Sequence, residues 1–382
     1  MRIGILGTRG IPNQYGGFEQ FGEYAAPILV ERGHEVFVYN SSSHPFHLKE
    51  WKGVTLIRKK DPENRLGTFG QFIYDFNCIL DARKRKFDVI LQLGYTSSSI
   101  WSLFFPKDPL LITNMDGLEW KRTKYSKSVQ WFLKQAEKWA VKYSDRLIAD
   151  STIIQSYLQV NHGQRATYIP YGATQFNDPD ELCLLKYRLK KFQYNMMVAR
   201  IEPENNIETI IKGHVDSRTT QSLLIIGNCT NKYAASLQKK YMDPRIIFYG
   251  PLFDIDELNQ LRYFSSFYFH GHSVGGTNPS LLEAMASQAL IVAHKNGFNQ
   301  DVLGEDAFYF TTSKDIMHLL NTDIKKHDHA EKIAANFAKI ASDYSWDHIV
   351  DLLEECIYST LFNFLPNKGT TTSAVNTDAT NP

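Results

Sequence analysis

The first half of the chain alternates short apolar runs with longer segments of helical spacing. An apolar run over 2–7 ends in glycine, helical spacing follows over 18–32, and an extended pattern resumes at 35–39. Further apolar runs lie at 54–58, 87–91, 110–113 and 146–149, and a long helical stretch ends in the basic run 83–86. Alternation of this kind predicts a doubly wound α/β domain with a parallel sheet.

The second half repeats the pattern after turn residues at 169–172 and a weakly patterned polar stretch, where we place the interdomain linker. Apolar runs at 194–199, 222–226, 245–248, 267–269 and 290–293, with a helix near 207–214, predict another Rossmann-like domain. We therefore expect domains over 1–172 and 173–343, and a helix over 344–365 that crosses back to the first domain. Residues 366–382, rich in Thr and Asn, are predicted to be disordered.

Composition excludes several classes of protein. The 382 residues suit two domains, and a formal net charge of +1 argues against a nucleic-acid partner. Four cysteines without C-x-x-C spacing fit a reducing cytoplasm. The opening apolar run is too short for a signal peptide, and no later run reaches about 18 apolar residues, so we expect any membrane contact to be peripheral.

A glycine-rich segment, GTRGIPNQYGGFE, begins where the first apolar run ends. Gly16 and Gly17 precede the expected helix, where backbone amides can face a pyrophosphate. A plain turn between strand and helix would explain the same glycines. A nicotinamide site fits poorly, because the spacing is not G-x-G-x-x-G and the second apolar run ends in Tyr39 and Asn40 instead of an acid.

The most specific signal is HGHSVGGTNPSLLEAMASQALIVA, over 270–293. Its part NPSLLEAMA resembles the donor-binding signature of glycosyltransferase family 4, a retaining family of GT-B fold. The resemblance implies two Rossmann-like domains facing across a cleft, with Glu283 binding the donor ribose and the loop from 275 to 280 binding diphosphate or sugar. These roles are chemically suitable, since a carboxylate accepts hydrogen bonds from a diol and a helix N-terminus stabilises phosphates. An exposed helix glutamate is the plainer alternative for Glu283.

Three further positions are interpreted by this resemblance. Arg200, in VARIEPENN, matches a phosphate-binding arginine of the family, although a surface salt bridge is an alternative. Asn205 and Gly275 stand where the family has a lysine and a second glutamate, and the missing carboxylate would suit a deoxy sugar. His270 and His272 flank the loop and either contact the donor or pack at a strand end. The predicted donor site comprises Gly16, Gly17, Arg200, Asn205, Gly227, Gly250, His270, His272, Gly275, Gly276, Thr277, Asn278, Ser280, Leu281 and Glu283.

Together with the opening loop, these motifs resemble the branch of family 4 that begins with G-[ST]-[RK]-G-I-P-x-x-Y-G-G-F-E and includes bacterial rhamnosyltransferases of capsule or surface polysaccharide synthesis. The resemblance implies transfer of L-rhamnose from dTDP-rhamnose, with retention, to a lipid-diphosphate-linked saccharide. UDP-glucose, UDP-N-acetylglucosamine and GDP-mannose remain alternative donors. A nucleotide-sugar epimerase and a noncatalytic nucleotide-sugar sensor remain alternative functions.

Catalytic polar groups are expected in ITNMDGLEWKR, over 112–122, which follows a predicted strand. Asp116, and next Glu119, would orient the acceptor hydroxyl or balance an oxocarbenium-like charge, and Arg200 would stabilise the leaving diphosphate. An Asx-turn is the plainer interpretation of Asp116. Since Arg200, loop amides and helix dipoles can stabilise the leaving diphosphate, we expect no metal requirement and no cofactor. The predicted acceptor side comprises Tyr15, Asn114, Asp116, Lys121 and Arg122.

A basic segment, 121–127, precedes an expected helix that contains Trp131, Phe132, Trp139 and Tyr143. Basic residues beside exposed aromatic rings suit an anionic membrane and a diphosphate-lipid acceptor. A core-facing helix with a solvated basic rim explains the same pattern. The sequence therefore favours a cytoplasmic protein that could lie on the inner face of the membrane.

Overall fold

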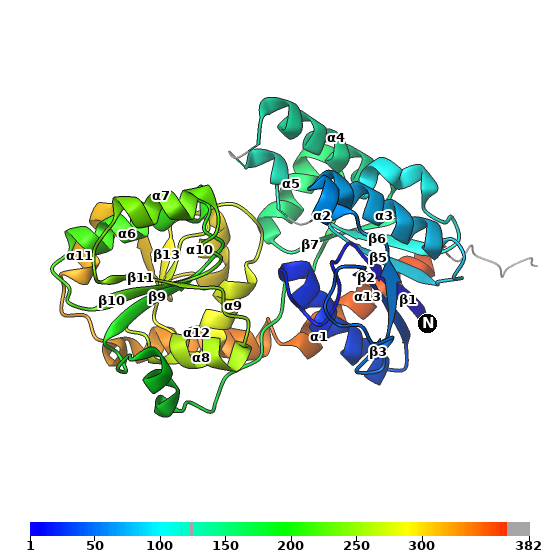
Figure 1. The fold of residues 1–382 in the computed structure, drawn as a ribbon. Coiled ribbons are helices and arrows are strands. Elements are labelled where there is room, and N and C mark those ends of the chain that lie inside the picture. The colour runs from blue at the N-terminus through cyan, green and yellow to red at the C-terminus, as the bar shows by residue number, and fades with distance from the viewer. Residues whose placement is uncertain (116, 123–124, 365–382) are drawn as a thin grey trace, which may run out of the picture.

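The computed structural model describes residues 1–115, 117–122 and 125–364, which fold around two parallel sheets flanked by helices (Figure 1). The first sheet has the order β3-β4-β2-β1-β5-β6-β7-β8, and its described strand pairings are parallel except that of β3 with β4. The strands are β1 (Arg2–Leu6), β2 (Glu35–Ser41), β3 (Glu50–Trp51), β4 (Val54–Lys59), β5 (Val89–Leu93), β6 (Leu110–Asn114), β7 (Arg146–Ala149) and β8 (Thr167–Tyr168). The helices around them are α1 (Gly17–Glu31), α2 (Glu63–Leu66), α3 (Phe69–Ala82), α4 (Lys127–Tyr143) and α5 (Thr152–His162).

The second sheet has the order β11-β10-β9-β12-β13-β14, with parallel pairings throughout its described strands. The strands are β9 (Tyr194–Val198), β10 (Ser222–Ile226), β11 (Ile246–Gly250), β12 (Tyr268–His270), β13 (Ile291–His294) and β14 (Phe308–Phe310). The α-helices of this domain are α6 (Ile207–Asp216), α7 (Lys232–Lys240), α8 (Ile255–Phe264), α9 (Pro279–Ala286), α10 (Gly297–Leu303), α11 (Ser313–Leu320) and α12 (Ala330–Ser342). Counted along the chain, this is the Rossmann order 3-2-1-4-5-6.

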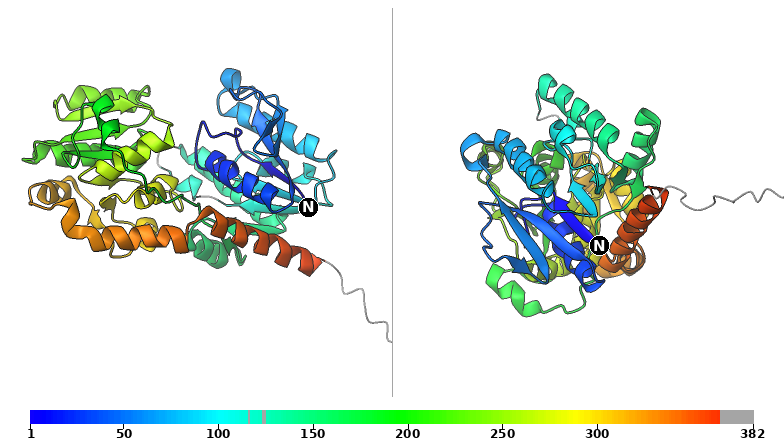
Figure 2. Two further views of the ribbon diagram at one scale, coloured as in Figure 1. Left: turned by 90° about the horizontal axis from the view of Figure 1, so that it is seen from below. Right: turned by 90° about the vertical axis from the view of Figure 1, so that its right-hand side faces the viewer.

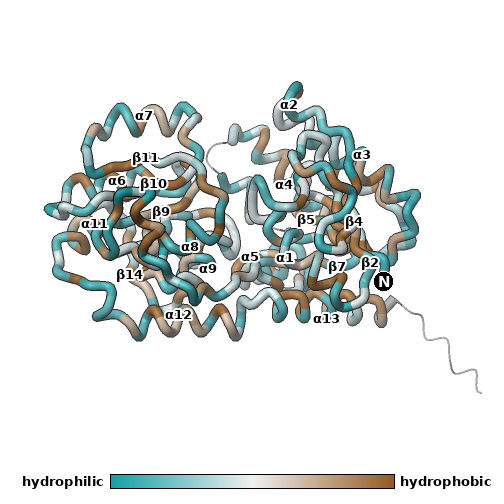
Figure 3. Tube along the Cα trace, turned by 60° about the horizontal axis from the view of Figure 1, so that its bottom comes forward, coloured by the Kyte–Doolittle hydropathy of each residue, from teal (hydrophilic) through white to brown (hydrophobic). Residues whose placement is uncertain are grey.

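Apolar runs form these strands because both faces of each sheet are covered by helices, which leaves no polar face for alternation. Ile3, Ile5, Met196 and Leu224 are accordingly buried. Figure 3 shows hydrophobic positions concentrated in the strands and hydrophilic positions along the outer helices. No helix in the described ranges is both long and apolar enough to cross a membrane.

The chain returns to the first domain through α13 (Trp346–Phe364), which continues beyond α12 along one side of the molecule (Figure 2). Trp346 stacks on Tyr24 of α1, with ring centroids 4.8 Å apart. Arg32 donates to Asp351 and Glu354, each at 2.6 Å. The predicted disordered segment 366–382 lies outside the described residues.

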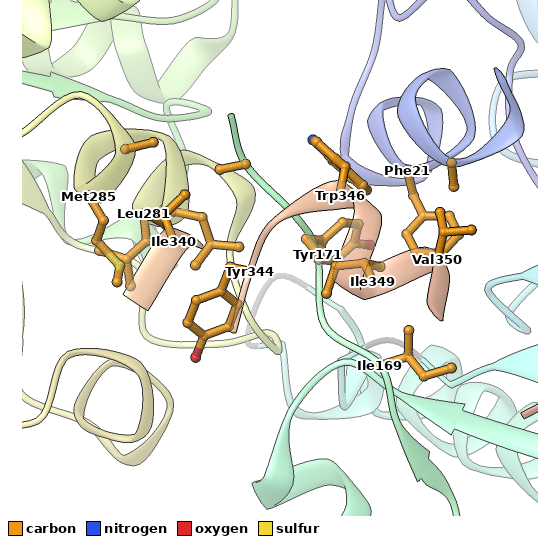
Figure 4. Packing of buried hydrophobic residues seen from close by; sticks show 14 of the residues in the cluster. Phe21, Ile169, Tyr171, Leu281, Met285, Ile340, Tyr344, Trp346, Ile349 and Val350 are labelled. Carbon is orange, nitrogen blue, oxygen red and sulfur yellow. The ribbon is translucent and has the colours of Figure 1, made fainter. Parts of the chain in front are cut away.

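Buried apolar residues form one cluster through the junction of the two domains. Figure 4 shows Phe21 and Tyr171 of the first domain beside Trp346, and Leu281 and Met285 of α9 on the other side. At this junction the Ala173 amide donates to the Tyr344 carbonyl at 2.8 Å. The two chain crossings between the domains are therefore hydrogen-bonded to each other.

Candidate functional site

The strand order brings together segments that are far apart in the sequence. β9 and β12 are neighbours at the centre of the second sheet, where the chain reverses its direction of progress. Arg200 follows β9, and the glycine-rich loop follows β12 and leads into α9. Ligands of open α/β sheets bind at such a switch point, beyond the carboxyl ends of the strands. The first sheet has its own switch point between β1 and β5, beside the GTRGIP loop.

The glycine-rich loop of the second domain lies against the first domain. The Thr277 hydroxyl donates to the Asp150 carbonyl. A Cβ added to Gly276 would lie 1.9 Å from an Asp150 carboxylate oxygen, so this position admits only glycine in the observed arrangement. A Cβ on Gly17 would lie 3.1 Å from the Tyr171 hydroxyl oxygen and 3.4 Å from Pro279 Cγ. The starts of α1 and α9 are therefore close to each other across the domain boundary.

Glu283 is held on both carboxylate oxygens. Gln20 of the first domain donates to Oε1 at 2.7 Å, and the Arg262 guanidinium pairs with Oε2. Arg262 is fully buried and also donates to Asn259 Oδ1 at 3.1 Å. The Glu283 side chain is only 15% exposed, so it is not the solvated helix glutamate of the plainer interpretation.

Arg200 is exposed after β9, and its charge acts on His272 and on Glu19 of the first domain. Within the described ranges its guanidinium makes no hydrogen bond or ion pair. Asn205 is buried and donates to the Arg200 carbonyl at 2.8 Å, so it positions the backbone of Arg200. Gly275 has φ +132°, and an added Cβ there would meet no atom within 4 Å. The position of the family's second glutamate is therefore open space beside a backbone suited to glycine.

The start of α9 is already partly capped. The Asn278 side chain accepts hydrogen bonds from the Ser280 amide at 3.0 Å and from the Ser280 hydroxyl at 2.8 Å. Leu281 packs in the core, and its amide donates to the Asn278 carbonyl at 3.0 Å. Neither the Ser280 amide nor the Leu281 amide is presented to a ligand in this conformation.

His270 and His272 stack on each other, with ring centroids 4.4 Å apart and an interplanar angle of 18°. Burial, and then the charges of Arg200 and Arg122, lower the pKa of His272 to about 3. Burial, and then His272, lower the pKa of His270 well below its usual value. Both rings are therefore neutral near pH 7. Within the described residues neither ring nitrogen of His270 has a hydrogen-bond partner, which suits a packed strand end beneath the loop.

The remaining predicted glycines have two different structural reasons. A Cβ on Gly227 would lie 2.0 Å from the Ala199 carbonyl oxygen, so the main chains of β9 and β10 approach too closely for a side chain. Gly250 has φ +98° and open space around it. Gly250 therefore reflects backbone conformation, and Gly227 reflects close approach.

The predicted acceptor residues come from the loop before α1 and from the end of β6 with the segment after it. Asp116 lies outside the described residues. Asn114 is buried at the end of β6. Arg122 donates to Glu119 at 2.7 Å and lies 3.6 Å from Glu204 of the second domain, so these three side chains connect the domains. Lys121 lies over the Trp120 ring, at 5.5 Å from its centroid, and exposed Tyr15 lies beside Arg9, 5.5 Å from ring centroid to Cζ.

The sequence interpretation missed a group of buried acids at the carboxyl edge of the first sheet. Glu19 is 4% exposed and accepts the Arg9 amide at 2.6 Å, and Arg9 pairs with Glu63 at 3.0 Å. Asp75 accepts the Ser97 hydroxyl at 2.6 Å, and burial raises its pKa to about 6. Burial also raises the pKa of Glu19. Glu19 and Arg9 stand inside the GTRGIPNQYGGFE motif, whereas nothing in the sequence singles out Asp75.

A cavity of about 540 Å³ lies beside Glu283, between α1, the interdomain linker and α8. Its lining consists of Gln20, Tyr24, residues 173–178, Ile255, Asp256, Asn259, Gln260, Glu283 and Trp346. Across residues 1–115, 117–122 and 125–364, no group of three or more His, Cys, Asp and Glu side chains is arranged to hold a metal ion.

Comparison with solved structures defines the class of fold. Sucrose-phosphate synthase from Thermosynechococcus elongatus superposes with a TM-score of 0.76 at 15% identity, over 95% of this chain and 99% of that one. HepE from Anabaena, in complex with UDP-glucose, gives 0.75 at 17% identity, over 94% and 100%. A glycosyltransferase from Rickettsia africae gives 0.65 at 14% identity, over 95% and 98%. The predicted fold is confirmed, since the chain has the two-domain GT-B fold of these glycosyltransferases.

Sequence comparison is less specific. Residues 1–174 match a domain family described only as a domain of unknown function, DUF1972. No curated protein matches the chain.

Proposed function

We propose that this protein is a retaining glycosyltransferase whose donor is a nucleoside diphosphate sugar bound at the carboxyl edge of the second sheet. The observation that carries the proposal is the convergence of Arg200, the loop from 275 to 280 and Glu283 at the switch point of that sheet. An unpaired guanidinium beside glycine-rich backbone suits a diphosphate. The UDP-glucose complex of HepE supports this class of donor.

The donor would extend from Arg200 past α9 into the 540 Å³ cavity. Arg200 and the loop amides bind the diphosphate, Glu283 accepts hydrogen bonds from the ribose, and the base enters the cavity near Asn259 and Gln260. In the observed conformation Gln20 donates to the Glu283 oxygen that the ribose needs. When the nucleotide sugar binds, a ribose hydroxyl therefore replaces the Gln20 amide as the group that donates to Glu283 Oε1.

The acceptor would approach from the first domain. Its carboxyl edge carries Glu19 and Asp75, and carboxylates accept hydrogen bonds from sugar hydroxyls. Asp116 or Glu119 would orient the reacting hydroxyl. The new bond forms between the acceptor oxygen and the anomeric carbon as the bond to the diphosphate oxygen breaks, on the same face of the sugar. The leaving diphosphate takes the acceptor proton, and Arg200 stabilises its charge.

We further propose dTDP-rhamnose as the donor and a lipid-diphosphate-linked saccharide as the acceptor, in bacterial surface polysaccharide synthesis at the cytoplasmic face of the membrane. The open space at Gly275 supports a sugar with one hydroxyl fewer to satisfy. Trp131 on α4 is exposed beside the basic segment, which supports a peripheral membrane contact.

The test is a thermal-shift screen against dTDP-rhamnose, UDP-glucose, UDP-N-acetylglucosamine, GDP-mannose and NAD, followed by an assay of donor hydrolysis and transfer. We expect stabilisation by dTDP-rhamnose and slow release of free rhamnose. Arg200→Ala should lower turnover by ~100- to 1,000-fold, because it removes the charge opposite the leaving group.

The matched control is Arg218→Ala, at an exposed arginine outside the cleft. A response to another nucleotide sugar would keep the transferase and replace the donor. Binding without hydrolysis or transfer would favour a sensor, and conversion to an isomeric nucleotide sugar would favour an epimerase. An unchanged turnover in Arg200→Ala would contradict the proposed diphosphate site.

A further inference from the structure

A second cavity, of about 930 Å³, lies at the opposite edge of the second sheet from the donor loop. It is bounded by the residues before β9, β10 and β12 and by the start of α12, which runs along the lower side of this domain in Figure 1. Its large apolar lining residues are Phe192, Tyr263, Phe267, Leu320, Ile324, Ile333 and Phe337. Because it opens at the amino ends of the strands, it is separate from the interdomain cleft.

Lys326 projects into this apolar surrounding. Its ammonium donates to the Tyr263 carbonyl and lies 5.0 Å from the Tyr263 ring centroid and 5.5 Å from that of Phe192. Burial lowers the pKa of Lys326 to about 7. Phe192, which covers the ammonium, holds a φ of +57°, a backbone region that non-glycine residues rarely adopt.

The other charged groups lining the cavity leave this ammonium without a counter-charge. Lys325 pairs with Asp323 at 3.6 Å, and Lys191 pairs with Glu181 at 2.8 Å. His327 pairs with Asp328 at 3.2 Å. Within the described part of the chain, Lys326 itself makes no ion pair. A half-buried cation held against aromatic rings without an anion is destabilised, and a ligand that supplied the anion would reduce that cost.

We propose that this cavity is a second ligand site, which takes an organic monoanion with an apolar body, such as a fatty or aromatic carboxylate. The apolar body fills the space between the aromatic rings and α12, and the anionic group pairs with Lys326. The site does not depend on the proposed transferase activity, since none of its lining residues belongs to the cleft.

The test uses the full-length protein and the fluorescent anion 1-anilinonaphthalene-8-sulfonate, displaced by octanoate or by the neutral octanamide. We expect octanoate to displace the probe at concentrations at least tenfold lower than octanamide. The octanoate Kd should rise at least fivefold from pH 6.5 to 8.5, because octanoate stays charged while Lys326 loses its proton. Equal displacement by acid and amide, or a Kd that does not change with pH, would overturn the proposal.

Variants separate the charge from the apolar space. Lys326→Met should remove the preference for octanoate over octanamide, and Lys314→Met, at an exposed lysine of α11 that does not line the cavity, should keep it. If Lys326→Met fails to fold, as judged by circular dichroism, the comparison of octanoate with octanamide and the pH series on the wild-type protein still test the proposal. Absence of probe binding to the folded wild-type protein would also overturn the proposal.

Discussion

The carboxyl edges of the two sheets share a topology and differ in charge. Both have a switch point, a glycine-rich loop and a helix beginning at that loop. The first edge carries the buried acids Glu19 and Asp75 around Arg9. The second carries exposed Arg200 and two neutral histidines, together with Glu283, which pairs with Arg262, and buried Glu204, which lies 3.6 Å from Arg122.

The difference supports the proposal that the second edge binds the diphosphate. α1 has Glu19 in its first turn, so an internal carboxylate already lies near the positive end of that helix. α9 has no acid in its first turn and has Arg200 nearby. A diphosphate therefore suits the second edge, and the first edge suits a ligand that offers hydroxyl groups. The prediction that Gly16 and Gly17 bind the donor has weaker physical support than the prediction for the second loop.

The largest expected effect on stability comes from replacing a carboxylate at each of the two edges. Glu283→Ala leaves Arg262 buried and unpaired, which should cost ~3–5 kcal/mol of unfolding free energy. Glu19→Gln removes a carboxylate whose pKa is raised by burial. It should change the unfolding free energy by no more than ~1 kcal/mol.

Urea unfolding followed by far-ultraviolet circular dichroism measures both variants. Glu283→Gln is the control for shape, since it keeps a hydrogen-bond acceptor toward Arg262. Equal losses in Glu283→Ala and Glu19→Gln would remove the contrast between the two edges. A large loss of stability in Glu283→Ala would make Glu283→Gln the suitable variant for donor-binding assays.

The next effect is an opposite dependence on pH. The raised pKa of Asp75 gives the first domain a stability contribution that is present below pH 3.8 and is lost as pH rises through about 6. The lowered pKa of His272 gives the second domain a contribution that is present above pH 6.5 and is lost as pH falls toward 3. Between pH 6.5 and 4.5 the second domain should lose ~2–3 kcal/mol while the first gains ~2 kcal/mol.

Tryptophan fluorescence reports on the first domain and α13, because residues 173–343 contain no tryptophan, whereas circular dichroism reports on both domains. Asp75→Asn should flatten the slope of the fluorescence transition between pH 4.5 and 6.5. Parallel slopes for the two signals would show that the charge difference between the edges does not change the pH dependence of the unfolding free energy.

The smallest effect concerns the contact between the edges. Gln20→Ala removes the hydrogen bond that occupies Glu283 Oε1. Since a ribose would otherwise have to replace that bond, the Kd of the stabilising nucleotide sugar should fall by ~2- to 10-fold. Isothermal titration calorimetry measures it, with Gln71→Ala on α3, outside the cavity lining, as control. A weaker affinity in Gln20→Ala would instead mean that Gln20 contacts the donor.

Sequence periodicity predicted the strands well because parallel strands are apolar on both faces. The runs at 146–149 and 222–226 coincide with β7 and β10. β3, β8 and β14, each of two or three residues, were missed because so few residues carry no periodicity. The partners of Glu283 were not predictable, since Gln20 and Arg262 reach it only through tertiary structure. The resemblance-based roles of the site residues remain predictions, and that of Asp116 lies outside the described residues.

The hydrogen bond between Ala173 and Tyr344 has a consequence for modularity. The chain enters and leaves the second domain at neighbouring points. The second domain is therefore topologically an insertion into a unit made of residues 1–172 and α13. A short peptide could bridge that point and excise the insertion without moving α13 from α1. The matched domain family ends at residue 174, at the same point, and thus omits the helix whose Trp346 covers Tyr24. A fragment cut at that boundary would expose an apolar face of α1 that the intact chain keeps covered.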